Sequence, residues 1–82
     1  MSTSASPTTA ELITGLLVGR FDVDPAAVRP DARMTELLAD SLMVVEMAIT
    51  LKDELGVGVS EDELRELTFA EFSARVDAHR AA

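Results

Sequence analysis

The fold is decided by residues 40–56, which read DSLMVVEMAITLKDELG. Asp40 is a favourable helix N-cap, because a carboxylate at that position can accept a hydrogen bond from an N–H group of the first turn. Gly56 is a favourable end, because glycine readily takes the left-handed conformation that closes many helices. The stretch predicts a helix that starts at Asp40 and runs to about Leu55.

Two apolar stripes run along this helix when its residues are placed at about 100° each. The broader stripe is an adequate core face and consists of Val44, Met47, Ala48, Leu51 and Leu55. The second stripe consists of Leu42, Val45 and Ile49. Glu46 and Asp53 lie beside the second stripe and Lys52 on its other edge, so we expect it to be partly exposed and open to partner proteins. The alternative is that both stripes are buried, as is usual for a helix that is apolar nearly all round.

Capping boxes predict helices on both sides of this stretch. Thr8 and Glu11 form one such box. The apolar residues that follow have the spacing of one helix face, with Gly19 as a plausible end: Leu12, Ile13, Leu16 and Leu17. Two more boxes open a short helix and a last helix: Ser60–Glu63 and Thr68–Glu71. Apolar residues continue both helices: Leu64 and Leu67 in the short one, Phe69, Phe72 and Val76 in the last.

Residues 20–39 show no periodic pattern and predict a long loop. The prolines at positions 25 and 30 disfavour helix in the residues before them. A structureless loop of this length is uncommon in a compact domain and usually functional. Its spaced apolar residues suggest that it is pinned across the helices.

These elements predict a small all-α four-helix bundle, with three main helices, one short helix and a long ordered loop between the first and second. The chain has 82 residues, which suffices for one domain and excludes a deep catalytic cleft. We expect a flexible leader over residues 1–7 and the domain over residues 8–80.

Composition narrows the function classes. The chain has no cysteine, which excludes disulfides, thiolate nucleophiles and cysteine–metal sites. Its net charge of −8 disfavours binding to nucleic acid and to anionic membranes, and it favours the approach of the protein to basic protein surfaces. No apolar run approaches the roughly 18 residues that span a bilayer, and the start does not resemble a signal peptide. We expect a soluble cytoplasmic protein.

Ser41 follows the Asp40 cap and therefore lies in the first turn of the central helix. There, backbone N–H groups lack intrahelical partners and the helix dipole favours negative charge. A phosphodiester on Ser41 would be stabilised, and the hydroxyl is accessible where the long loop meets the helix. If only Asp40-Ser41-Leu42 is considered, an ordinary helix start is the commoner explanation for these residues.

The wider sequence resembles the acyl carrier proteins. Residues 37–47 are similar to the phosphopantetheine attachment site of that family, in which Asp-Ser-Leu opens the second helix and a glutamate follows the serine by five residues, as Glu46 does here. Residues 52–57 resemble the end of that helix. The short third helix, the start of the last helix and the opening of the first loop are matched by residues 60–67, 68–72 and 21–25. The resemblance covers residues 9–78.

The resemblance implies a non-catalytic carrier with 4'-phosphopantetheine on Ser41. It implies that a phosphopantetheinyl transferase recognises Asp40 and Leu42. It also implies that Glu46 orients partner enzymes such as a ketosynthase or an acyltransferase. Acyl groups would be held as thioesters on the thiol of the cofactor. The stripe around Ser41 would be the docking face, with Val45, Ile49 and Asp53 in it. We expect a monomer without a metal site.

Three positions depart from the family pattern. Leu38 stands where glycine is common, and it is expected to alter the approach to the serine. Met43 and Lys52 stand where acidic residues are common, which favours a carrier of polyketide or similar secondary metabolism. Three alternatives remain: a fatty-acid carrier, a peptidyl carrier and a cofactor-free acidic interaction module.

An enzyme is disfavoured by the residues themselves. The chain has one histidine, His79, near its C-terminus, where capping a helix end is the ordinary role. No general base lies close to Ser41 in sequence, and a serine nucleophile needs one. Residues 53–63 lack the alternating ligands of a calcium loop.

Overall fold

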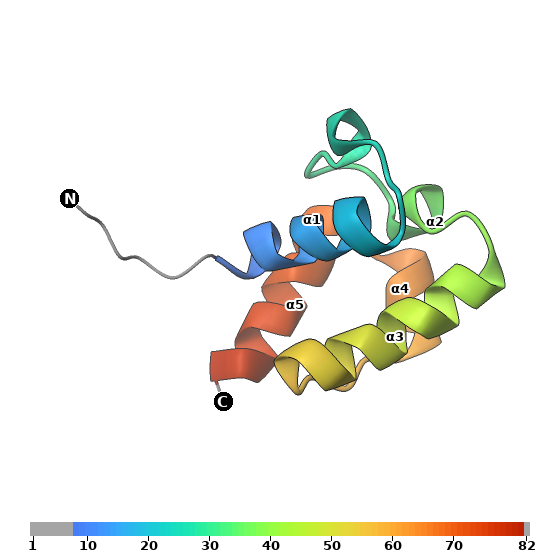
Figure 1. The fold of residues 1–82 in the computed structure, drawn as a ribbon. Coiled ribbons are helices and arrows are strands. Elements are labelled where there is room, and N and C mark those ends of the chain that lie inside the picture. Colours follow the sequence, from blue (N-terminus) through green and yellow to red (C-terminus); the bar gives the residue numbers. More distant parts are fainter. Residues whose placement is uncertain (1–7, 82) are drawn as a thin grey trace.

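The computed structural model describes residues 8–81, and the expected leader at residues 1–7 lies outside this range. The described chain is helical and confirms the predicted all-α bundle (Figure 1). Its elements are α1 Thr9–Arg20, the 3-10 turn η1 Pro25–Ala27, α2 Met34–Leu37, α3 Ser41–Leu55, α4 Glu61–Glu66 and α5 Phe69–Ala81. The three long helices are α1, α3 and α5, and α4 is the predicted short one. No helix within residues 8–81 combines the length and apolar composition needed to cross a membrane.

The three predicted capping boxes are all formed: Thr8–Glu11, Ser60–Glu63 and Thr68–Glu71. In each box the N-cap hydroxyl accepts from the glutamate N–H and the glutamate carboxylate accepts from the N-cap N–H. These donor–acceptor distances lie between 2.8 and 3.2 Å. The N–H of Ser60 is the main reason that the pKa of Glu63 is lowered from its ordinary 4.5, and the Arg75 guanidinium adds to the effect while desolvation opposes it. The α4 cap is therefore more favourable with the carboxylate of Glu63 ionised.

The end of α1 differs from the prediction. Gly19 was expected to stop the helix, but α1 continues to Arg20. The left-handed residue is instead Asp22, with φ 60°, and the N–H groups of Phe21 and Val23 both donate to the carbonyl of Leu17. Aspartate tolerates this conformation better than most residues do. The helix therefore ends one residue after Gly19, and the left-handed turn follows at Asp22.

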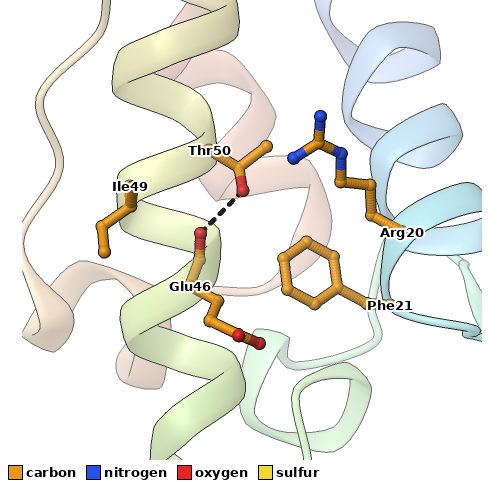
Figure 2. A pocket seen from close by; sticks show the side chains of 5 residues that line it. All are labelled: Arg20, Phe21, Glu46, Ile49 and Thr50. Atoms are coloured by element: carbon orange, nitrogen blue, oxygen red, sulfur yellow. Dashed lines mark hydrogen bonds between the residues drawn. The ribbon is translucent and has the colours of Figure 1, made fainter.

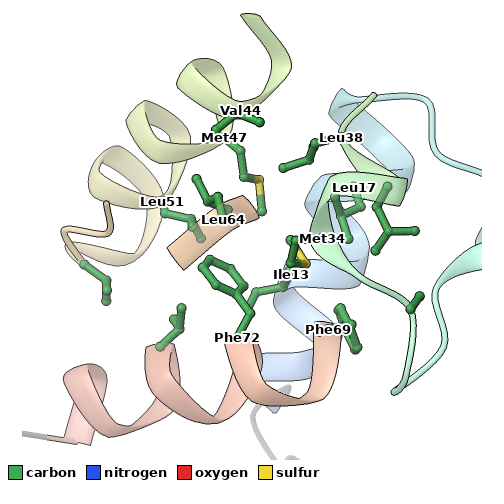
Figure 3. Close-up of a cluster of buried hydrophobic side chains, with 14 residues drawn as sticks. Ile13, Leu17, Met34, Leu38, Val44, Met47, Leu51, Leu64, Phe69 and Phe72 are labelled. Atoms are coloured by element: carbon green, nitrogen blue, oxygen red, sulfur yellow. The ribbon is translucent and has the colours of Figure 1, made fainter. Parts of the chain in front are cut away.

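The core lies where all five helices meet (Figure 3). It consists of Ile13, Leu17, Ala32, Met34, Leu37, Leu38, Val44, Met47, Leu51, Val57, Leu64, Phe69, Phe72 and Val76. α1 packs against α5, and both α2 and α3 pack against α4. Burial of these side chains supplies the main drive to fold.

The long loop is ordered, as predicted, but it contains η1 and α2, which the sequence pattern did not reveal. Asp24 caps η1 by accepting from the N–H of Ala26 at 2.9 Å. α2 has no side-chain cap. It is held by backbone hydrogen bonds to a distant segment, because residues 30–34 pair with residues 67–70 around a bridge between Arg33 and Thr68. The loop is thereby fixed across the start of α5.

Candidate functional site

Ser41 is the first residue of α3 and is exposed. Asp40 precedes it as the N-cap, and its Oδ1 accepts from the N–H of Met43 at 2.9 Å. The first turn of α3 still offers N–H groups without intrahelical acceptors, at the positive end of a 15-residue helix. An oxygen-linked anion on Ser41 would lie in a favourable field. The position therefore suits a phosphoester.

The chain reaches Ser41 through a short segment fixed by two leucines. Leu37 and Leu38 are buried, whereas Ala39 and Asp40 are exposed. The N–H of Leu38 donates to the carbonyl of Met34 at 2.8 Å. Figure 3 shows the Leu38 side chain in the core, pointing toward α3. The side chain of Leu38 thus holds the segment before Ser41 from the core side, and its expected effect on the approach to Ser41 stays a prediction.

The two stripes of α3 differ in burial as the charge pattern predicted, although Ala48 and Leu55 of the broader stripe are only partly buried. Val44, Met47 and Leu51 form the inner face and are at most 3% exposed. Leu42, Val45 and Ile49, which we call the apolar ridge, are 66%, 36% and 56% exposed. The alternative in which both stripes are buried is therefore wrong.

Charged side chains border the ridge. Asp40, Glu46 and Asp53 are exposed, and so is Lys52. The structure thus brings every predicted site residue onto one face of α3 or its N-cap. An exposed apolar surface with a charged border is typical of a protein–protein contact.

A hollow of about 350 Å³ lies beside the ridge, between α3 and the end of α1 (Figure 2). It is lined by Arg20, Phe21, Glu46, Ile49 and Thr50. Arg20 and Phe21 were not predicted to belong to the site, because only the fold brings the end of α1 beside α3. Thr50 was not predicted either; it is buried, and its hydroxyl donates to the carbonyl of Glu46 at 2.8 Å, as helical threonines commonly do.

His79 lies in the last turn of α5 and is exposed, at the position expected of a helix-capping residue. Figure 1 shows that end of α5 far from the start of α3. Among residues 8–81, no three histidine, aspartate or glutamate side chains gather into a possible metal site. The group of this site that could carry a covalent modification is the exposed hydroxyl of Ser41.

Comparison with known proteins agrees with this geometry. The family model of the phosphopantetheine attachment site matches residues 11–76. An acyl carrier protein of Solidesulfovibrio magneticus is 34% identical over 59 residues, which cover 71% of this chain and 76% of the relative. One of Zymomonas mobilis is 31% identical over 75 residues, covering 89% and 96%. One of Thermosynechococcus vestitus is 36% identical over 58 residues, covering 70% and 72%. No solved structure gave a significant match.

Proposed function

Because the chain belongs to the acyl carrier proteins, a family of non-catalytic carriers that bear phosphopantetheine, we propose that Ser41 is the residue that carries the arm. The observation that carries this proposal is the exposed Ser41 hydroxyl at the first position of α3, directly after the Asp40 cap. Ser60 also lies at a helix start, but it is itself an N-cap and its hydroxyl accepts from Glu63. Ser73 is buried. Among the serines of residues 8–81, Ser41 is the one that is exposed and does not cap a helix.

The residues around Ser41 hold the attachment point rather than react. Asp40 fixes the start of α3, so the Ser41 oxygen is presented at a defined place. The free N–H groups of the first turn and the helix dipole stabilise the phosphodiester by about 0.3–1 kcal/mol. When bound, the arm supplies the thiol that this cysteine-free chain lacks, on which acyl groups are carried as thioesters. The chain itself orients the arm and presents it to other enzymes.

The apolar ridge is proposed as the surface on which those enzymes dock. Leu42 lies next to Ser41, and Val45 and Ile49 continue the ridge along α3. Glu46 and Asp53, together with Asp40 at the helix start, would pair with basic side chains of a phosphopantetheinyl transferase, ketosynthase or acyltransferase. Such charges mainly steer and orient the encounter, while the apolar contact contributes affinity.

We place the carrier in polyketide or a related secondary metabolism. The support is the apolar and less acidic character of α3, in which Met43 and Lys52 occupy positions where acidic residues are common in the family. The competing hypothesis is that the protein is a carrier of fatty-acid synthesis. Acyl transfer from the loaded protein to ketosynthases of the two kinds would distinguish them, and faster transfer to the fatty-acid enzyme would contradict the placement.

The first experiment is intact-protein mass after incubation with coenzyme A and a broad-specificity phosphopantetheinyl transferase. We expect a gain of one phosphopantetheinyl group in the wild type. The same gain is expected in Ser60→Ala, the matched control, because that serine only caps α4. Ser41→Ala should gain nothing while keeping its helical circular dichroism, because Asp40 still caps α3. Loading of Ser41→Ala, or no loading of the wild type by several transferases, would contradict the proposal.

A further inference from the structure

The charges that border the apolar ridge are not all of one sign. Glu46 and Asp53 follow one edge of the ridge on the helical wheel, and Lys52 lies on the other edge. All three side chains are exposed. A partner that covers the ridge therefore meets the carboxylates of Glu46 and Asp53 and also the ammonium of Lys52.

Ile49 lines two hollows, so this end of the ridge is flanked on both sides. The first is the hollow at the end of α1, in which Arg20 and Glu46 supply the charges. The second also has a volume of about 350 Å³, and it lies between α3 and the segment that follows it. Its lining consists of Ala48, Ile49, Lys52, Asp53, Gly58 and Val59. Each hollow can receive an apolar partner side chain against Ile49, with one acid and one base at its border.

The two cations at these hollows, Arg20 and Lys52, differ in whether they pair with a carboxylate of the chain. The guanidinium of Arg20 is 3.7 Å from a carboxylate oxygen of Glu54. Lys52 forms no ion pair within residues 8–81, where the three ion pairs found all involve arginines. Its exposed ammonium therefore remains available to a group from outside the chain.

We propose that Lys52 is a partner-selecting residue, which pairs with a carboxylate of the enzyme that docks on the apolar ridge. This inference rests on the proposed docking function. The partner has two apolar side chains for the hollows beside Ile49, basic groups opposite Glu46 and Asp53, and an acidic group opposite Lys52. A partner surface that is basic throughout would place like charges at Lys52, and like-charge contacts suppress wrong partners.

Lys52 is the single lysine of the chain, which allows a direct test. The probe is the acetyl-loaded protein with the ketosynthase of the source organism that accepts acetyl groups from the wild type fastest. A zero-length carbodiimide joins an amine to a carboxylate only when the two are in contact. We expect a cross-link between Lys52 and an aspartate or glutamate of the ketosynthase, identified by peptide mapping. Lys52→Arg loses this cross-link because it lacks the amine, yet it preserves the charge.

Transfer kinetics supply the second readout. Lys52→Glu should lower kcat/KM for acetyl transfer about three- to tenfold at low salt, with a smaller effect at high salt. Lys52→Arg should stay closer to the wild type. Arg29→Glu changes the net charge equally at an exposed loop position away from the ridge, and it should change the rate less than twofold.

Two results would overturn the inference: mapped cross-links that exclude Lys52, or a Lys52→Glu rate equal to or above that of the wild type. Arm attachment to Ser41 is measured separately by mass. A protein that loads normally but fails these tests refutes the role of Lys52 alone. A protein that does not load refutes the proposed function instead.

Discussion

The inner face and the apolar ridge are two sides of one helix, built from the same kinds of residue but placed beside different neighbours. On the inner face, Met47 and Leu51 have no exposed surface, because α4 and the rest of the core cover them. On the ridge, Leu42 and Ile49 remain more than half exposed. Hydropathy therefore does not decide which side of α3 is buried; the charged residues beside the ridge do. The inner face stabilises the fold, and the ridge stays exposed, as the proposed docking role requires.

A matched pair of leucine truncations should separate the two faces most strongly. Leu51→Ala leaves a cavity in the core and should lower the free energy of unfolding by about 2–5 kcal/mol. Leu42→Ala should change it by less than about 0.5 kcal/mol, because that side chain is 66% exposed. Urea denaturation of both variants measures the difference. Equal losses of stability in the two variants would contradict the difference in burial between the two faces.

Alanine substitutions of Gly56 and Gly58 should test the turn that brings the chain back over the inner face at the end of α3. Gly56 has φ 70°, and the next residue, Val57, enters the core. Gly56→Ala should cost about 1 kcal/mol, because a side chain disfavours the left-handed conformation. Gly58 lacks a positive φ and has open space around a would-be Cβ, so Gly58→Ala should be neutral or stabilise by up to about 1 kcal/mol. Thermal unfolding compares them, and a larger loss in Gly58→Ala would refute this account of the turn.

The smallest effect concerns pH and the cap of α4, the helix that covers the inner face. The pKa of Glu63 is lowered in the folded state by the N–H of Ser60 and by Arg75, so its charged form stabilises the fold above the ordinary pKa of 4.5. That contribution is lost as the pH falls through the folded-state value, below 4.5. Glu63→Gln retains an acceptor for Ser60 but does not ionise. Its stability should decline less than that of the wild type between pH 6 and pH 3.5, by about 0.5 kcal/mol or less. An identical decline would show that the cap does not depend on the charge.

The helix boundaries that the sequence predicted well are those set by local side-chain chemistry. The Asp40 cap, the Gly56 end and the three capping boxes each involve residues within a few positions of one another, so their spacing is visible in the sequence. The exposure of the ridge was also predictable, because Glu46 and Asp53 mark that side of the wheel.

The features that were missed depend on tertiary contacts or on turns too short for periodicity. α2 has four residues and no side-chain cap, and it is held by the N–H of Met34 donating to Leu67. The end of α1 was set by Asp22 in the left-handed conformation instead of by Gly19. Leu38 was expected only to alter the approach to Ser41, and its place in the core depends on packing against distant segments. Arg20 and Phe21 belong to the site only because the fold brings the end of α1 near α3.

The pairing of residues 30–34 with residues 67–70 makes the loop before Ser41 depend on residues that are synthesised later. The N–H of Phe69 donates to Ala32 at 2.7 Å, and that of Ala70 donates to Pro30 at 3.0 Å. The loop that leads to Ser41 is therefore anchored by residues that leave the ribosome well after Ser41 itself. A nascent chain that ends before these residues lacks the anchor, although its serine has already been made. If Ser41 carries the arm as proposed, chains that end before residues 67–70 should be poorer substrates for loading.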